Sequence, residues 1–378
     1  MSITPFNKPY LTGKEVHYIY QAVSSGKISG DGLFTKKCHE FFEKRYGFKK
    51  CLLTSSCTDA LEMAAILLNL QPGDEVIMPS YTFVSTATAF VLRGANIIFC
   101  DSRKDHPGMD EDQIESLITE KTKAIVPVHY GGVACDMDKI MDVATKYNLF
   151  VVEDAAQSIE AYYTGRDGVK KPLGSIGHMS AFSFHETKNI MSGEGGMLVI
   201  NDDRFIERAE IIREKGTNRS KFFRGELDKY GWVDIGSSFL PSDIIAAFLY
   251  AQLENIDDIQ KKRISIWNNY MSQLSGCTDK FSMPYIPPYA TNNAHMFYIV
   301  FKNLEERTKM ITRLKENGFN AVYHYLSLHK SPFYEGKYAG KELPETDRYT
   351  DCLLRLPLFY ELTDEEINGI TKTLRGEL

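Results

Sequence analysis

Short apolar runs alternate with longer segments of helical period between residues 50 and 200. Runs that are apolar almost throughout are typical of strands buried on both faces of a sheet. The expected strands are Cys51–Thr54, Glu75–Met78, Asn96–Cys100, Ala124–Val128, Phe150–Glu153, Met179–Phe184 and Met197–Ile200. The expected helices between the early strands are Thr58–Leu70, Ser85–Leu92, Glu111–Ile118 and Met137–Tyr147. The pattern predicts an α/β fold with a mostly parallel central sheet and helices on both faces. The last two strands are too close in sequence for a helical crossover, so that pair can be antiparallel or irregular.

The second half of the chain has a different pattern. After Asp203 it becomes mainly helical, with expected helices Arg204–Lys215, Ser242–Asn255 and Asp257–Leu274. Beyond a proline-rich break, the tail predicts a strand, a helix, a strand and a closing helix at Met296–Phe301, Leu304–Asn317, Ala321–Tyr325 and Asp364–Leu374. We therefore expect a large domain of residues 14–255 and a smaller α/β domain of residues 256–378, together with residues 1–13.

Composition excludes several classes of protein. Of the 378 residues, 43% are hydrophobic and 25% are charged, as in ordinary globular proteins. The net charge of −6 without a basic block argues against nucleic acid as a partner. No apolar run reaches the roughly 18 residues of a membrane span, and the N-terminus does not resemble a signal peptide. The seven cysteines are scattered without a Cys-x-x-Cys pair, and the histidines are dispersed. We expect no disulfide framework, no metal and a cytoplasmic location.

Lys188 is the most informative single residue. It lies in a polar turn after an expected strand, and Gly193-Glu194-Gly195-Gly196 follows it before the next one. A reversal there would aim the lysine inward, where burial or a neighbouring cation lowers its pKa and allows a Schiff base to form. A solvated turn lysine is an equally good reading of this segment alone.

Three further segments lie just past expected strands, where parallel sheets collect ligands. Thr54–Ala60 has small and hydroxyl side chains that suit a phosphate at a helix N-terminus, or a plain N-cap. Asp154 could hold a protonated ring nitrogen with Gln157 nearby, or cap the next segment. Phe83 could stack on a planar ring, or belong to the core. A phosphate cradle, an aromatic lid, a carboxylate and an inward lysine together describe a pyridoxal 5'-phosphate site.

The chain resembles the DegT/StrS-type nucleotide-sugar aminotransferases over essentially its whole length. The resemblance is carried by Gly73–Thr86, Val126–Tyr130, Glu153–Gln157, Phe182–Asn189 and Glu214–Ser220. It implies a fold type I pyridoxal phosphate-dependent aminotransferase, which is a homodimer with its active sites at the subunit interface.

The same resemblance implies roles for individual residues. Lys188 would bind the cofactor covalently and then carry protons, and Asp154 would pair with the pyridinium nitrogen. Phe83 would stack on the ring, and Gln157 would lie near its 3-oxygen. The residues implied for the phosphate are Cys57, Thr58, Ser183 and, across the dimer, Ser238.

Three of these positions depart from the family. Cys57 stands where a glycine is usual, which requires a negative φ. Ser238 and Leu240 stand where many relatives have an asparagine and an arginine.

The expected substrates and the residues that bind them follow mostly from the resemblance. It implies transfer of an amino group from L-glutamate to C4 of dTDP-4-keto-6-deoxy-D-glucose. Arg219 lies in a basic stretch that could reach a nucleotide diphosphate, or form a solvated loop. Tyr323, His324 and His329 match a family segment near the sugar, although such residues are often packing residues.

Three other activities are alternatives to this one. One is amination of another nucleotide keto-deoxysugar, at C3 or with gluco outcome. Another is dehydration of a sugar, for which some relatives replace the lysine with histidine, so Lys188 argues against it. The last is a non-enzymatic or regulatory relative, which would not need a Schiff-base lysine.

Overall fold

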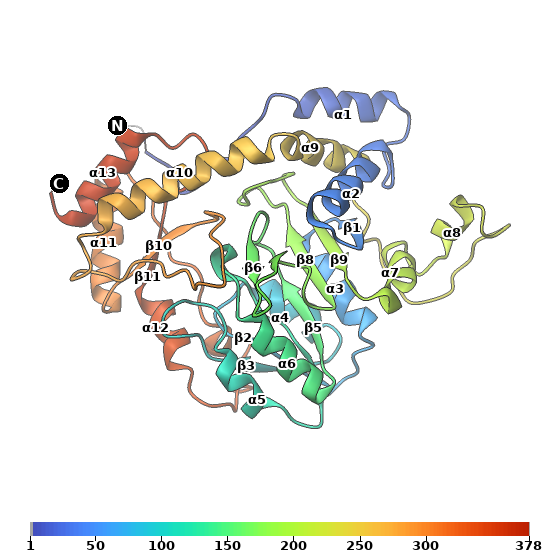
Figure 1. Cartoon of the computed structure of the whole chain (residues 1–378), viewed down its shortest axis with the longest axis horizontal. Coiled ribbons are helices and arrows are strands. Elements are labelled where there is room, and N and C mark those ends of the chain that lie inside the picture. The colour runs from blue at the N-terminus through green and yellow to red at the C-terminus, as the bar shows by residue number, and fades with distance from the viewer. Residues whose placement is uncertain (1–2, 378) are drawn as a thin grey trace.

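A seven-stranded sheet forms the centre of the computed structural model, which describes residues 3–377 (Figure 1). The strand order is β1-β9-β8-β5-β4-β2-β3. The strands span Lys50–Thr54 (β1), Glu75–Pro79 (β2), Asn96–Cys100 (β3), Thr122–Ile125 (β4), Phe150–Asp154 (β5), Met179–Ser183 (β8) and Gly196–Ile200 (β9). All pairs from β3 to β8 are parallel, and β9 is antiparallel to both β8 and β1. This confirms the α/β class and the mostly parallel sheet, and it shows that the closely spaced last pair is antiparallel.

Helices cover both faces of the sheet, as the near-continuous apolar strands require. The first face packs on α3 (Cys57–Leu67), α4 (Val84–Val91) and α7 (Ile206–Arg213). The second packs on α2 (Leu33–Tyr46) and α9 (Asp243–Leu253) at one end and on α6 (Met137–Tyr147) at the other. Strand β9 shows the alternation, because Leu198 and Ile200 face the first set of helices while Met197 and Val199 face the second.

A second core lies beside the sheet and is built from the C-terminal third of the chain. Its elements are α10 (Ile256–Leu274), β10 (Phe297–Val300), α11 (Leu304–Glu316), α12 (Pro344–Cys352), β11 (Leu353–Leu356) and α13 (Asp364–Arg375). Helix α10 joins the two bodies (Figure 1): Ile256 and Ile259 pack in the sheet core, whereas Ile266 and Leu274 pack in the second core.

We accordingly propose to keep the domain boundary at the start of α10. Residues 1, 2 and 378 of the expected small domain lie outside the described residues.

The predicted strand Ala321–Tyr325 is wrong. The partner of β10 is β11, in antiparallel register, and Val322 makes a single bridge to Arg355. The backbone then turns to other partners, because the hydroxyls of Tyr81 and Tyr130 donate to the carbonyl of His324 at 2.7 and 3.0 Å. The segment is therefore held by side chains of the large domain instead of by a strand ladder.

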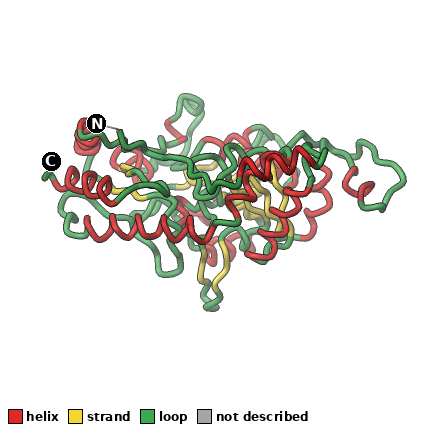
Figure 2. The backbone as a smooth tube through the Cα atoms, turned by 90° about the horizontal axis from the view of Figure 1, so that it is seen from above, coloured by secondary structure: helices red, strands yellow, loops and turns green. Residues whose placement is uncertain are grey.

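Other elements were shorter than expected or were not predicted. The expected helix Glu111–Ile118 is a 3₁₀ turn, Glu111–Gln113, followed by the single-turn α5 (Ile114–Leu117). The remaining helices and strands are α1 (Glu15–Ser24), α8 (Arg219–Phe223), β6 (Tyr162–Thr164) and β7 (Lys170–Pro172), with 3₁₀ turns at Tyr130–Gly132, Asp203–Phe205 and Leu328–Lys330. Strands β6 and β7 form a hairpin that stands out from the body (Figure 2). Among residues 3–377, no helix combines the length and the apolar character of a membrane span.

Gly196 sets how closely β9 approaches α3. A Cβ built on Gly196 would overlap the carbonyl of Ser56 and the amide nitrogen of Cys57. The first turn of α3 can therefore lie directly on the strand only because this position has no side chain.

We expect Gly196→Ala to lower the free energy of unfolding by about 1–3 kcal/mol, because the added methyl group must push β9 away from the backbone of α3. Urea unfolding of the purified protein measures the change. Gly276→Ala is the matched control, since a Cβ at Gly276 meets nothing within 4 Å. Equal stability of the two variants would contradict the close approach.

Candidate active site

The carboxyl ends of β1, β2, β5 and β8 lie at one edge of the sheet, and β9 begins at the same edge. Parallel α/β sheets bind ligands at this edge. The ends of these strands and the segments that follow them carry the predicted site residues Cys57, Phe83, Asp154 and Lys188. The topology therefore brings together residues that are far apart in the sequence.

Asp154 is the last residue of β5 and is buried. Its carboxylate accepts hydrogen bonds from Thr86 Oγ1 at 2.7 Å and from the amide of Ala156 at 3.1 Å. Thr86 is itself bonded to Thr82 at 2.8 Å, so the carboxylate has a fixed orientation. Burial raises the pKa of Asp154, while the hydrogen bond from Thr86 and the charge of Lys188 oppose the shift.

Lys188 lies close to Asp154 and is partly buried in the turn after β8. The turn is fixed by its backbone, since the Lys188 amide donates to the carbonyl of His185 at 2.9 Å. Burial lowers the pKa of the Lys188 amine, although the nearby Cys57 and Asp154 partly oppose this. The amine has no ion pair among residues 3–377. A larger fraction of it is therefore neutral and nucleophilic than for a surface lysine.

The first turn of α3 fits a phosphate group. Ser56 caps the helix by accepting from the amide of Asp59 at 3.1 Å, which leaves the amides of Cys57 and Thr58 for an anion. Thr58 Oγ1 donates to Ser85 Oγ at 2.8 Å. The φ of Cys57 is not positive, so a cysteine is accommodated at the position where the resemblance implies a glycine. Because Gly196 has no side chain, the start of β9 lies directly against the backbone of Ser56 and Cys57 at the first turn of α3.

Gln157 and Phe83 bound the same site. Gln157 is buried, with its Oε1 accepting from the amide of Gly131 at 2.6 Å and its Nε2 donating to Tyr325 OH at 3.0 Å. Phe83 is 55% exposed, and its ring lies 5.9 Å from that of Tyr325. An open aromatic face next to Tyr325, which is bonded to Gln157, suits a flat ring. Together with the phosphate cradle, these residues fit pyridoxal phosphate.

Of the predicted residues Ser183, Ser238 and Arg219, Ser183 lies at the carboxyl end of β8, at the same edge of the sheet. Ser183 ends β8 beside Gly196, and its Oγ accepts from the amide of His185 at 3.4 Å. Ser238 is exposed and forms a backbone bridge with Glu214. The residue after Ser238 is Phe239, whose carbonyl accepts from the amide of Ser55 at 2.9 Å. Arg219 begins α8, which projects away from the sheet (Figure 1).

Two predicted substrate residues contact groups other than Lys188. Tyr323 is 46% exposed and lies under the guanidinium of Arg307, at 4.5 Å. His329 is buried, bonded through Nδ1 to Ser80 at 2.8 Å and lying 3.5 Å from Asp347. Their roles in substrate binding stay predictions. His324 is different, because its ring lies 3.5 Å from the guanidinium of Arg355 at the site.

Tyr325 and Arg355 were missed by the sequence analysis. Tyr325 lies two residues after Tyr323, and only its hydrogen bond to Gln157 identifies it as the tyrosine of the site. Arg355 comes from β11, an element that was not predicted. Its one sequence signal is a charge within the apolar run Leu353-Leu354-Arg355-Leu356.

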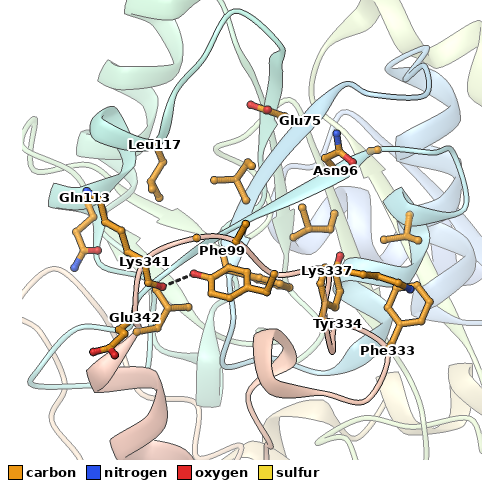
Figure 3. Close-up of a pocket in the computed structure, with 18 of the residues that line it drawn as sticks. Glu75, Asn96, Phe99, Gln113, Leu117, Phe333, Tyr334, Lys337, Lys341 and Glu342 are labelled. Atoms are coloured by element: carbon orange, nitrogen blue, oxygen red, sulfur yellow. Dashed lines mark hydrogen bonds between the residues drawn. The ribbon is translucent and has the colours of Figure 1, made fainter.

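A separate cavity of about 570 Å³ lies at the edge strand β3 (Figure 3). It lies between residues 95–99 and the segment 333–343, where Tyr338 OH donates to the carbonyl of Lys341 at 2.5 Å. None of the predicted site residues lines it. The cavity is therefore distinct from the site around Lys188.

Comparisons with known proteins agree with this geometry. The spore coat polysaccharide biosynthesis protein SpsC of Bacillus subtilis is 31% identical over 98% of this chain and 96% of its own length. The sugar aminotransferase Spr1654 of Streptococcus pneumoniae, described as putative and solved in its PMP form, is 26% identical, with a TM-score of 0.90 over 99% of this chain and 97% of that one. The same protein is also solved in a PLP form. DesV of S. venezuelae, in complex with a ketimine intermediate, is 27% identical, with a TM-score of 0.90 over 100% of this chain and 99% of that one.

The sequence model of one family matches residues 9–375, which is nearly the whole chain and includes every residue of the site described above. The protein belongs to the DegT/DnrJ/EryC1/StrS aminotransferase family.

Proposed function

We propose that this aminotransferase, with pyridoxal phosphate as cofactor, transfers the amino group of L-glutamate to C4 of dTDP-4-keto-6-deoxy-D-glucose. The product would be dTDP-4-amino-4,6-dideoxy-D-galactose, a precursor for surface polysaccharide of the enterobacterial common antigen type. The choice of sugar is supported by the subgroup segments Phe182–Asn189 and Glu214–Ser220. The PLP and PMP forms of Spr1654 and the polysaccharide role in the name of SpsC support the broader class.

The observation that carries the proposal is the closeness of Lys188 to Asp154 beside the first turn of α3. This cofactor needs three groups: a lysine of lowered pKa, an oriented carboxylate for the ring nitrogen, and helix amides that are free to bind the phosphate. When bound, pyridoxal phosphate supplies an electron sink for the carbanion that forms at the amino-bearing carbon.

The residues of the site would each have a separate role in the reaction. Lys188 would hold the cofactor between turnovers and, once released, move a proton from and to the amino-bearing carbon. Asp154 would keep a proton on the ring nitrogen, and Thr86 holds its carboxylate in one orientation. Phe83 would cover the ring, and Gln157 would contact its 3-oxygen.

The phosphate would lie on the amides of Cys57 and Thr58, with Ser183 beside them. Such a site uses the partial positive charge of the helix N-terminus.

The shared site of a homodimer is part of the proposal. The segment that contains α8 and its following loop exposes large apolar side chains: Phe223, Trp232 and Val233 are 65%, 83% and 54% exposed. Exposed apolar groups of this size commonly mark a protein interface. The exposed Ser238 follows this segment, so a second copy that covers the segment would also reach the phosphate site, and Arg219 would face the nucleotide diphosphate.

Incubation with dTDP-4-keto-6-deoxy-D-glucose and L-glutamate, followed by NMR of the product, tests the assignment. We expect one product with an axial amino group at C4. A C3-amino or gluco product would overturn the choice of sugar chemistry and leave the cofactor assignment intact.

Lys188→Ala should abolish turnover but still bind pyridoxal phosphate noncovalently, because the phosphate and ring contacts remain. Absorbance of the bound cofactor, with mass spectrometry after borohydride treatment, checks both statements. Lys121→Ala, at an exposed position, is the control and should keep the covalent adduct. Normal activity of Lys188→Ala would refute the role of the lysine.

Asp154→Asn should lower kcat by about 10²–10³-fold, because a neutral amide no longer stabilises the protonated ring nitrogen. Steady-state kinetics at saturating cofactor measures this, and Asp112→Asn serves as an exposed control. Near-normal turnover of Asp154→Asn would show that the carboxylate does not act on the ring.

A further inference from the structure

Arg355 is a buried cation in an apolar strand. It is the third residue of β11, lies opposite Tyr298 of β10, and is only 8% exposed. Its neighbours Leu354 and Leu356 are packed in the second core. A buried charge is costly unless an opposite charge or a full set of hydrogen bonds compensates it.

Arg355 has little compensation within the chain. Its Nη1 lies 3.5 Å from Nδ1 of His324, and its Nε is buried without a hydrogen-bond partner. The ring of Phe6 lies 5.0 Å from its Cζ and covers one side of the guanidinium. Among residues 3–377, no carboxylate forms an ion pair with it. The guanidinium therefore has donors that are available to an anion.

Other buried arginines of this protein do have acceptors. Arg213 pairs with Asp31, Arg263 donates to the carbonyls of Ala294 and His295, and Arg307 donates to the carbonyl of Asp351. These arginines have structural roles. The difference singles out Arg355 as a binding group.

The guanidinium of Arg355 lies at the Lys188 site. Its neighbour His324 has its carbonyl fixed by Tyr81 and Tyr130, and Tyr325 is bonded to Gln157. Arg355 is also close enough to Lys188 for its charge to lower the pKa of the amine. The cations Arg355 and Arg263 thus outnumber the carboxylate of Asp154 in this region even when Lys188 is neutral, and the excess positive charge attracts an anionic ligand.

The position of Arg355 indicates which anion of the proposed reaction it binds. The cofactor phosphate has its own cradle at the first turn of α3. The diphosphate of a nucleotide sugar is separated from C4 by the sugar ring. The α-carboxylate of an amino acid is bonded directly to the carbon that carries the amine, so it must lie beside Lys188 when that carbon reacts. The planar guanidinium can bind a carboxylate through two parallel hydrogen bonds.

We infer that Arg355 binds the α-carboxylate of the amino donor and so selects an α-amino acid in the donor half-reaction. This inference rests on the proposed aminotransferase function. The sugar half-reaction uses the same lysine and carboxylate but places no carboxylate at this position. Arg355 therefore acts on one of the two substrates.

The test measures the two half-reactions separately in single-turnover experiments that follow the cofactor absorbance. One starts from L-glutamate and the other from the amino sugar. Arg355→Met should lower the second-order rate constant of the half-reaction with L-glutamate by about 10- to 100-fold, the usual loss for a charge-assisted hydrogen-bond pair. The rate with the amino sugar should change by less than about threefold, and Arg355→Lys should recover part of the glutamate rate.

Binding is measured independently of turnover by calorimetry with glutarate, a dicarboxylate that has no amine to transfer. Arg355→Met should weaken glutarate binding at least about tenfold. Thermal unfolding of Arg355→Met should be no lower than that of the native protein, because the substitution removes an uncompensated buried charge. Arg348→Met is the matched control, since Arg348 already has Glu345 as its partner at 2.7 Å.

Unchanged glutarate binding by Arg355→Met would overturn the inference, as would equal losses in both half-reactions or a loss confined to the amino sugar. A native protein that converts neither substrate would instead refute the proposed function. The glutarate titration would then still decide whether Arg355 binds a carboxylate.

Discussion

The Glu153 carboxylate is completely buried at the centre of the sheet and is held by four hydrogen bonds. The amides of Gly174, Ile176 and Gly177 donate to it at 2.8, 2.8 and 2.6 Å, and His129 Nε2 donates at 3.0 Å. His129 Nδ1 accepts from the amide of Cys135 at 3.3 Å, which leaves Nε2 as the ring nitrogen that faces Glu153. This anion ties β5, which ends in Asp154, to the turn that leads into β8, the strand that the Lys188 turn follows.

The two adjacent acids at the end of β5 therefore have opposite roles because strand side chains alternate. Glu153 points to one face, where backbone amides satisfy it fully. Asp154 points to the other face, where Thr86 and one amide satisfy it only in part and burial raises its pKa. A carboxylate with remaining acceptor capacity beside a lysine is suited to chemistry, whereas a fully bonded carboxylate is suited to holding the fold. Glu153 thus holds the backbone in the geometry on which the role of Asp154 depends.

The sequence was sufficient for the parts of this protein that depend on local pattern. Buried parallel strands are recognisable as apolar runs, and polar residues just past them indicate the ligand edge, so Lys188, Asp154 and Gln157 could be predicted. The partner of β10 could not be predicted, because pairing between residues 297–300 and 353–356 depends on contacts between segments far apart in the sequence. For the same reason the residues that the second core supplies to the site, Tyr325 and Arg355, were missed.

Tyr323 shows why neighbouring residues of one type cannot be separated by pattern alone. Tyr323 and Tyr325 would share a face in a regular strand, which was the predicted conformation. The segment is not a strand, and its carbonyl at His324 is bound by two tyrosine hydroxyls of the large domain. Tyr325 then reaches Gln157 while Tyr323 stacks under Arg307 at the surface.

The N-terminal segment couples the two bodies that form the site. Thr4 pairs with Phe319 and donates to Glu366 in the second core, and Phe6 covers Arg355. A few residues later, Asn7 donates to the carbonyl of Glu186 in the Lys188 turn at 3.3 Å. The same short segment thus contacts the guanidinium on one side and the lysine turn on the other. Because a reacting carboxylate must meet both groups at once, their separation matters more than the position of either, and this segment contacts the surroundings of both groups.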